Sequence, residues 1–200
     1  MIELLGKSLE ELQSIFKTHN IQKFRAKQLI DYIYHRYIFD FEDMTQFPKD
    51  LRQWLGDNCV ISLPTLITES IAPDGKTRKI LVEMSDQSRV EAVLMEQHYG
   101  YSVCVSSQVG CAMGCVFCAS TQGGLYRDLT VAEIIGQVVI FGALTKEEIH
   151  SVVVMGAGEP LQNYDNVLQA LQLLHDPMIC NISYRKMTIS TCGWVPNIYK

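Results

Sequence analysis

The sequence predicts an α/β fold in which an alternating strand–helix segment follows a small region of helices and antiparallel strands. Residues 1 to about 60 carry apolar residues at helical spacing, and short β-branched segments separated by turns continue to about residue 97. From residue 98 onward, predicted strands alternate with predicted helices. Such alternation is typical of a parallel sheet or barrel covered by its helices.

The helical region contains the stretch FRAKQLIDYIYHRYI, residues 24–38. Its predicted apolar stripe comprises Phe24, Leu29, Ile30, Ile33, Tyr34 and Tyr37. Its other face carries the basic residues Lys23, Arg25, Lys27 and Arg36. This pattern indicates a solvated helix face, and a small phosphate-contacting patch beside aromatic side chains is the alternative. Pro48 fits the first turn of another short helix, PKDLRQWL.

The next region contains three short segments rich in β-branched residues, namely LPTLITESI, KILVEM and RVEAVLM. Turn-forming residues separate them at positions 73–76 (PDGK) and 85–88 (SDQS). These signals predict an antiparallel meander that leads into a further strand over residues 101–105.

The remaining chain shows the strand–helix rhythm. Thr130 and Glu133 have the spacing of a capping box, which predicts the start of a helix over VAEIIGQVVIFGAL. IHSVVVMG is typical of a buried strand, and RKMTISTCG predicts another. Between these two strands, Asn163 can cap a helix over YDNVLQALQLLHD.

Composition restricts the class of protein. Of 200 residues, 48% are hydrophobic and 20% charged, which is typical of a globular protein that needs no disulfide or metal to fold. The start lacks a signal-peptide pattern, and no apolar run is long enough to span a membrane, so we expect a cytoplasmic protein. Seven mostly clustered cysteines argue against a disulfide framework. The net charge of −5 allows nucleic-acid binding only through a local basic patch.

Three of these cysteines, Cys111, Cys115 and Cys118, are spaced C-x3-C-x2-C in a glycine-rich stretch. Thiolates at this spacing can turn onto one soft metal centre. A structural zinc site needs four ligands, and Cys104 could supply the fourth. A [4Fe–4S] cluster held by only three cysteines would leave one iron open for chemistry. The spacing alone predicts a metal site and leaves both metals possible.

A second motif is VVVMGAGEPLQN, in which a strand ends in Gly156-x-Gly158 and turns into a helix. α/β proteins bind ligands at such turns. The motif is neither a dinucleotide fingerprint nor a Walker loop, because Leu161 replaces the third glycine and no Gly-Lys-Ser/Thr follows. Glu159 and the free carbonyls suit a ligand with an amino group. The alternative is a tight turn whose glutamate caps a helix.

Together, C-x3-C-x-aromatic-C and a later strand ending in Gly-Glu-Pro resemble the radical S-adenosylmethionine (SAM) superfamily. More closely, the chain is similar to the RlmN/Cfr family of rRNA adenine methyltransferases. The similarity extends over CVSSQVGCAMGCVFCAS, LTVAEIIGQV, VVVMGAGEPLQN, TISTCG, FRAKQL, FEDMTQFPKDLR and RVEAVLM. It implies a partial (β/α)6 TIM-like barrel, with its first half in residues 98–200. A helical, RNA-contacting domain would occupy residues 1–60, and a β-meander extension residues 61–97.

The resemblance also implies site residues. Cys111, Cys115 and Cys118 would hold a [4Fe–4S] cluster whose open iron chelates SAM. The SAM contacts would be Phe117 against the adenine, Gly158 and Glu159 at the amino group and neighbouring atoms, and Ser190 from the next strand. Glu91 matches the family's proton acceptor, although its alternating strand pattern alone would make it a solvent-facing residue. Cys104 would be a secondary thiol beside the cluster.

The implied reaction uses SAM twice, once to methylate a carrier cysteine and once to generate a radical. The product would be adenine methylated at C2 in 23S rRNA at the peptidyl-transferase centre, and in tRNA beside the anticodon. Gly158-Glu159-Pro160 is more similar to this C2-methylating branch than to the C8-methylating Cfr branch. A flavodoxin-type electron donor is expected as a further partner.

We also expect the chain to be incomplete and inactive alone. About three strand–helix units are recognisable where the family has about six, and neither Cys180 nor Cys192 matches the carrier cysteine. Two alternatives stay open. One is a zinc-dependent RNA-binding module without catalysis, and the other is a radical SAM enzyme acting on a small molecule or peptide.

Overall fold

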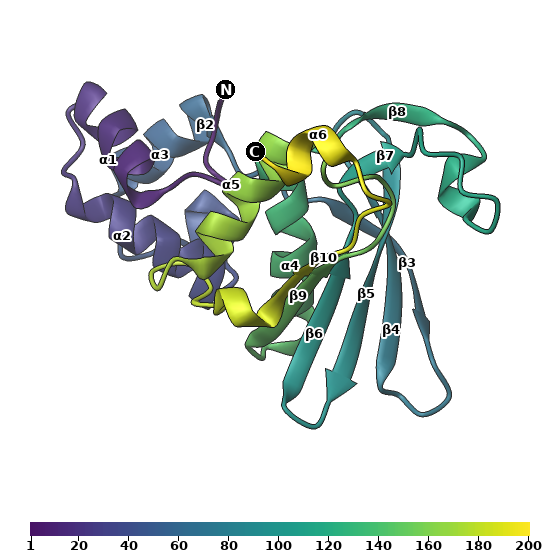
Figure 1. Cartoon of the computed structure of the whole chain (residues 1–200). Helices are drawn as coiled ribbons and strands as arrows, with labels where there is room; N and C mark the ends of the chain where they lie inside the picture. Colours follow the sequence, from purple (N-terminus) through teal and green to yellow (C-terminus); the bar gives the residue numbers. More distant parts are fainter.

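The computed structural model describes all 200 residues and is built around one six-stranded sheet (Figure 1). In spatial order the strands are β10 (Met187–Ile189), β9 (Ile149–Val154), β6 (Gly100–Val105), β5 (Arg89–Gln97), β4 (Thr77–Glu83) and β3 (Thr65–Ile71). The pairs from β3 to β6 are antiparallel, whereas β6–β9 and β9–β10 are parallel. β6 is therefore the strand at which the meander becomes an α/β sheet.

The predicted meander is confirmed, with turns that agree with the PDGK and SDQS signals. The two faces of this sheet differ. Along β5, Val90, Ala92 and Leu94 are buried, while Arg89 and Glu91 on the opposite face are exposed. We call the face that carries Glu91 the open face, because the long helices pack on the other one.

Helix α4 (Val131–Thr145) contacts β6 and β9, and α5 (Tyr164–His175) packs against α4. The predicted capping box is confirmed, because Thr130 Oγ1 accepts from the Glu133 N–H and Glu133 Oε2 accepts from the Thr130 N–H. The predicted capping role of Asn163 is wrong. Its side chain makes no cap hydrogen bond, because Nδ2 donates to two carbonyls of the site described below and Oδ1 accepts from Asn166 Nδ2.

The N-terminal region comprises β1 (Ile2–Glu3), α1 (Leu9–Thr18), α2 (Phe24–Ile30), the π-helical turn η1 (Asp31–His35), the 3-10 turn η2 (Phe41–Asp43), α3 (Lys49–Asn58) and β2 (Cys59–Val60). β1 and β2 form a short parallel ladder that was not predicted. The helix predicted over residues 24–38 is shorter in the structure. α2 ends at Ile30, and the π-helical turn η1 follows it before Tyr37, which has a φ of 54°. This region packs on α4, and one continuous hydrophobic cluster joins the two.

One residue of the predicted apolar stripe is misplaced. Leu29, Ile30, Ile33 and Tyr34 are buried, but the side chain of Phe24 is 51% exposed. Phe24 is the first residue of α2, beyond the edge of the core, and the Arg25 guanidinium lies 4.7 Å from its ring centroid. Helical spacing identifies the face of a residue but not whether the core extends as far as that turn.

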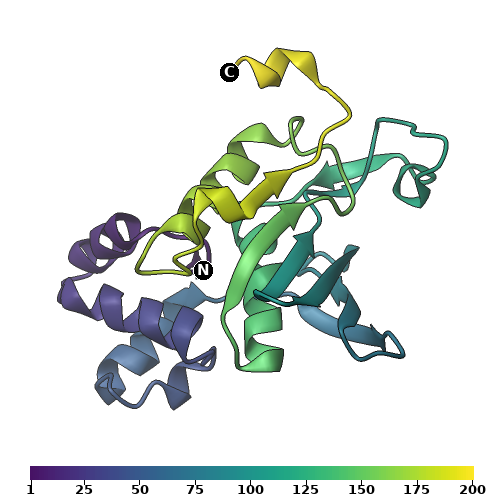
Figure 2. The ribbon, with the colours of Figure 1, turned by 60° about the horizontal axis from the view of Figure 1, so that its bottom comes forward.

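Two short strands lie outside the main sheet, β7 (Gln108–Gly110) and β8 (Leu125–Asp128), and they pair with each other. The 3-10 turn η3 (Ala119–Thr121) lies in the loop between them, and η4 (Tyr184–Lys186) and α6 (Val195–Ile198) complete the chain. Figures 1 and 2 show this loop and the N-terminal helices at opposite ends of the molecule. None of the helices has the length and apolar character needed to cross a membrane.

Candidate active site

Three loops meet where the parallel strands end. β6 leads through Ser106 and Ser107 into β7, β9 leads into the Gly-Glu-Pro turn, and β10 leads into Ser190. Because the carboxyl ends of parallel strands lie at one edge of a sheet, this order brings the predicted motifs to the same place. Backbone hydrogen bonds join them, with Gly156 N–H donating to Val105 O at 3.0 Å and Ser190 N–H donating to Val154 O at 3.0 Å.

The cysteine motif occupies residues 111–124, the loop between β7 and β8, which we call the cysteine loop. Its base is closed by Cys111 N–H donating to Gly124 O at 3.0 Å, and a turn forms where Cys118 N–H donates to Cys115 O at 3.0 Å. Gly110 has a φ of 75°, and a Cβ there would clash with Gly124 O, so this corner requires glycine. The loop is therefore anchored firmly at its base.

The three thiols lie on this one loop, but the structure does not gather them around a common point. Cys111 is buried and Cys115 and Cys118 are half-buried. No group of three or more His, Cys, Asp or Glu side chains has an arrangement suited to a metal ion. Cluster binding would therefore require the side chains of the loop to turn inward. Three soft sulfur donors within eight residues do fit an iron–sulfur cluster chemically.

Cys104 is separate from this loop. It lies on β6, opposite Val93 of β5 and Val153 of β9, so its side chain belongs to the open face. The thiol is half-buried, and burial raises its pKa above the ordinary value, with a smaller opposing effect from a hydrogen bond to the Met155 backbone. The structure thus does not assemble Cys104 with the loop cysteines as a four-thiol site.

The Gly-Glu-Pro turn follows β9 and lies directly against β7. Gly158 has a φ of 106°, and a Cβ there would clash with Gln108. A Cβ on Gly156 would clash with Ser106 in the same way. The adjacent Glu159 N–H donates to Gln108 Oε1 at 2.8 Å. Both glycines are required because the turn approaches the β6–β7 connection so closely.

Glu159 itself is only 2% exposed, and its carboxylate is fully engaged by the chain. It accepts hydrogen bonds from Leu161 N–H (2.9 Å), Thr191 Oγ1 (2.7 Å) and Cys192 N–H (2.8 Å). Burial alone would raise the pKa of this carboxyl group, but these hydrogen bonds outweigh burial and lower it below the ordinary value. The carboxylate therefore fastens the loop after β10 to the turn after β9.

Ser190 and Cys192 lie on the segment held in this way. Ser190 is exposed at the carboxyl end of β10. A hydrogen bond with Glu159 raises the pKa of the exposed Cys192 thiol to about 11, and the nearby Cys115 contributes to the same shift. Cys192 therefore lies near the cysteine loop. Phe117 is at the tip of that loop and is 91% exposed, so its ring face is open to a ligand.

Glu91 lies on the open face of β5, where its carboxylate pairs with Lys79 Nζ at 2.9 Å. Its backbone is connected to the site through Ser106. Ser106 Oγ donates to Glu91 O at 2.8 Å and accepts from Ala157 N–H at 2.9 Å. The structure thus ties the backbone of Glu91 to the Gly-Glu-Pro turn, while its exposed side chain is held by a surface ion pair.

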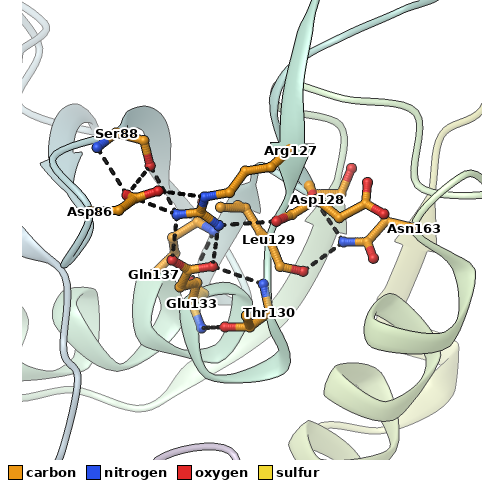
Figure 3. Close-up of polar contacts among 10 residues, drawn as sticks. Asp86, Ser88, Arg127, Asp128, Leu129, Thr130, Glu133, Gln137 and Asn163 are labelled. Atoms are coloured by element: carbon orange, nitrogen blue, oxygen red, sulfur yellow. Dashed lines mark hydrogen bonds and ion pairs between the residues drawn. The ribbon is translucent and has the colours of Figure 1, made fainter.

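A second network supports the cysteine loop from outside (Figure 3). Arg127 of β8 donates to both oxygens of Asp86 (2.7 and 3.0 Å) and to both oxygens of Glu133 (2.8 and 2.7 Å). It also donates to Ser88 Oγ at 2.9 Å. The bonds from Arg127 hold the pKa of Asp86 well below its ordinary value. One guanidinium therefore joins β8, the β4–β5 turn and the start of α4.

Two buried amides complete the framework. Gln108 donates to Asp128 Oδ1 at 2.7 Å while accepting from Glu159, so it joins β8 to the Gly-Glu-Pro turn. Asn163 donates to Ser107 O (2.8 Å) and Leu129 O (2.7 Å), which fixes both ends of the β7–β8 unit. None of Arg127, Gln108 and Asn163 was predicted as a supporting residue. Their sequence context contains no signal for it, because the named partners other than Glu133 are 20 or more residues away in sequence.

Comparison with known proteins agrees with this arrangement. Residues 2–61 match the family described as "Ribosomal RNA large subunit methyltransferase N-terminal domain". Residues 105–200 match the family described as "Radical SAM superfamily". The probable dual-specificity RNA methyltransferase RlmN of Symbiobacterium thermophilum is 48% identical over 197 residues, which is 98% of this chain and 53% of that protein. The protein of the same name from Clostridium perfringens strain 13 is 44% identical over 198 residues, covering 99% of this chain and 57% of its own length.

A solved structure is also similar. The crystal structure of a radical SAM methyltransferase from Sphaerobacter thermophilus matches 99% of this chain and 59% of its own length, with a TM-score of 0.93 and 35% sequence identity. This chain spans about half the length of the curated relatives it matches. In sequence and in fold, the chain is therefore similar over almost its whole length to RlmN proteins and to a radical SAM methyltransferase.

Proposed function

We propose that the protein carrying this sequence methylates C2 of an adenine in RNA, both in 23S rRNA at the peptidyl-transferase centre and in tRNA beside the anticodon. The observation that carries the proposal is that the connection leading into the cysteine loop (Ser106–Gln108), the Gly-Glu-Pro turn and Ser190 meet at one sheet edge. The printed names of the relatives support RNA as the substrate class. A methyl-cysteine would act as the carrier of the methyl group.

In this proposal Cys111, Cys115 and Cys118 bind a [4Fe–4S] cluster. When bound there, such a cluster would supply the one-electron reduction of SAM. The chain's own contribution is to present three thiolates from a loop whose base is fixed at Gly110 and Gly124. Such fixing limits how far the thiolates must move, and the half-buried setting restricts water.

The SAM contacts follow from the positions of the loops. Phe117 would stack on the adenine, because its ring is exposed at the tip of the cysteine loop. Gly158 would leave room for the SAM amino group against backbone acceptors, and Ser190 would contact SAM from the end of β10. Because the carboxylate and the backbone N–H of Glu159 are already engaged by the chain, we propose that Glu159 contributes by holding the Thr191–Cys192 segment.

Glu91 is proposed as the proton acceptor. Its position on the open face is compatible with this role, since helices cover only the opposite face. The ion pair with Lys79 is exposed, so it would cost little to break when a base arrives. Cys104 lies on the same face and is proposed as a secondary thiol beside the site.

Several further assignments belong to the proposal. Pro160 after Glu159 favours the C2-methylating branch over C8-methylating Cfr-type activity. A flavodoxin-type protein would supply electrons, and residues 1–60 would contact RNA. The zinc-module alternative would need Cys104, which lies on β6 outside the cysteine loop, as its fourth ligand. A radical SAM enzyme for a small molecule or peptide would need no RNA-contacting region.

The test is to incubate the whole protein carrying this sequence, and not the 200-residue chain by itself, anaerobically with reductant, methyl-deuterated SAM and either 23S rRNA or tRNA. The RNA is then digested, and its nucleosides are identified by mass spectrometry against 2-methyladenosine and 8-methyladenosine standards. We expect labelled 2-methyladenosine from the native protein and none from the Cys115→Ala variant. Label in 8-methyladenosine would instead support the Cfr-type reaction, and label in neither nucleoside would contradict both.

A further inference from the structure

A hollow of about 520 Å³ lies where the N-terminal region meets the α/β part of the chain. Three segments contribute to its lining, namely the end of η1 as far as Tyr37, residues 146–150 from the end of α4 into β9, and residues 177–186 between α5 and β10. His35 Nε2 and Met178 O lie 3.1 Å apart, so the first and third segments touch. Figure 2 shows the third segment beside the N-terminal helices. The volume is in the range of small-molecule pockets, about 300–1,000 Å³.

The backbone around this hollow is unusual. Five non-glycine residues of the chain have a left-handed φ, and three of them line the hollow. They are Tyr37 (54°), Lys146 (59°) and Asn181 (53°), one from each of the three segments. Such conformations cost energy in residues other than glycine, and they are concentrated at sites where the surrounding structure requires them. All three segments therefore carry strain at the place where they meet.

The hollow is also lined by charges of both signs that have no partner in the chain. Lys146, Glu147 and Glu148 come from the second segment, and Lys186 comes from the third. All four residues are exposed, and none of them forms an ion pair. Two cations and two carboxylates give this lining no net charge. A ligand that carries both an anionic and a cationic group is therefore more complementary to it than a simple anion or cation.

The wall between these charges is neutral. Burial raises the pKa of the Cys180 thiol to about 12 and also raises that of the Tyr34 phenol, so both groups stay uncharged at pH 7. Burial, with smaller effects from the nearby Cys180 and Glu148, raises the pKa of Tyr37 as well, so Glu148 lies close to this phenol. The aliphatic residues of the lining, which we call the apolar wall, are Val138, Val139, Ile149, Ile179 and Ile182.

We propose that this hollow binds a free α-amino acid with an apolar side chain. The ligand's carboxylate pairs with Lys186, its ammonium group pairs with Glu148, and its side chain packs on the apolar wall. The inference goes beyond the proposed methyltransferase function and does not depend on it. The hollow is at the amino end of β9, whereas the Gly-Glu-Pro turn follows its carboxyl end. A strand of six residues separates the two places by roughly 20 Å.

The experiment is isothermal titration calorimetry of L-leucine into the whole protein carrying this sequence, with the 200-residue chain measured in parallel. Two analogues of the same shape each lack one charge. 4-Methylpentanoate has no amino group, and 3-methylbutylamine has no carboxylate. We expect L-leucine to bind about tenfold more tightly than either analogue, because each analogue leaves one charged partner in the hollow unpaired.

Two charge variants assign the contacts. Lys186→Gln should weaken the binding of L-leucine about tenfold and leave that of 3-methylbutylamine unchanged, because the amine never contacts this lysine. Glu148→Gln should weaken L-leucine by a similar factor and leave 4-methylpentanoate unchanged. The matched controls Lys49→Gln and Glu96→Gln are at exposed positions outside the hollow and should bind all three ligands as the native protein does.

The proposal is overturned if L-leucine shows no binding to the whole protein up to about 10 mM, well above a Kd of 1 mM. Equal affinities in the hollow variants and in their controls would also overturn it. Binding of 4-methylpentanoate as tight as that of L-leucine would make the hollow an anion site and contradict the assignment. Iron content and the spectral response to SAM are measured on the same preparations. They should be unchanged in both hollow variants, so failure here is distinguishable from failure of the proposed methyltransferase function.

Discussion

At the residue scale, the carboxylate of Glu159 accepts three hydrogen bonds from donors in two loops. These bonds stabilise the ionised form, so the pKa in the folded chain is lower than in the unfolded chain. The stabilisation is therefore fully present above the ordinary carboxyl pKa of about 4.3. It is lost as the pH falls through the lower folded value.

We expect Glu159→Gln to lower the free energy of unfolding by about 2 kcal/mol at pH 7, because its amide group cannot accept from all three donors. In a domain of this size this corresponds to a melting temperature lower by about 4–8 °C. The difference from the native chain should shrink below about pH 4. Chemical denaturation at pH 7 and pH 3.5 measures both effects, with the exposed Asp165→Asn as control. A difference that stays constant over this range would contradict the hydrogen-bond explanation.

Arg127 offers a second test at this scale, because its guanidinium holds β8 to two other elements. Arg127→Lys keeps the charge but replaces the planar fork by a single ammonium, which cannot bond both carboxylates in the same way. We expect backbone amides of residues 125–129 to exchange with deuterium about tenfold faster in Arg127→Lys, as local opening becomes easier. Arg89→Lys, at the exposed pair with Glu83, is the matched control. Unchanged exchange in the Arg127 variant would show that the network does not restrain the loop.

At the scale of elements, signals confined to a few residues predicted the structure well. Turn residues at 73–76 and 85–88 ended the meander strands, and Thr130 with Glu133 marked the start of α4. The failures involve distant partners. The Asn163 side chain donates to Ser107 O and Leu129 O instead of capping α5. The segments β7 and β8 are strands only because they pair with each other.

The α4 cap permits a direct measurement. Thr130→Ala removes the side chain that accepts from Glu133 N–H, so we expect a loss of about 1 kcal/mol in the free energy of unfolding. The melting temperature should fall by about 2–4 °C. Ser14→Ala, at an exposed position inside α1, is the control and should change stability little. An equal effect at both positions would mean that the capping box contributes nothing specific.

For the candidate site, the spacing of Cys111, Cys115 and Cys118 predicts a metal loop, and this stays a prediction. Only the resemblance, and not the spacing, implied that Gly158 and Glu159 belong to the same site. The engagement of the Glu159 carboxylate by Thr191 and Cys192 was not predictable, because it depends on how residues 32 and 33 positions apart in the sequence approach each other. Such supporting contacts become visible only in three dimensions.

At the scale of the whole molecule, the long helices leave one face of the sheet, the open face, uncovered. α4 and α5 cover one face, while Glu91 and Cys104 belong to the other. The chain spans 53% of the Symbiobacterium relative and 59% of the solved Sphaerobacter structure. The carboxyl edge of the sheet, where the Gly-Glu-Pro turn contacts the connection into the cysteine loop, can be tested directly.

The most direct test is the iron and sulfide content of the anaerobically reconstituted chain, with its visible spectrum recorded before and after SAM is added. We expect about four irons and four sulfides per chain and a spectrum that SAM perturbs. The Cys111/Cys115/Cys118→Ala variant should hold neither, and Cys59→Ala, a substitution in the buried core, should match the native chain. One tightly bound zinc without sulfide, or a cluster that persists in the triple variant, would contradict the assignment of the cysteine loop.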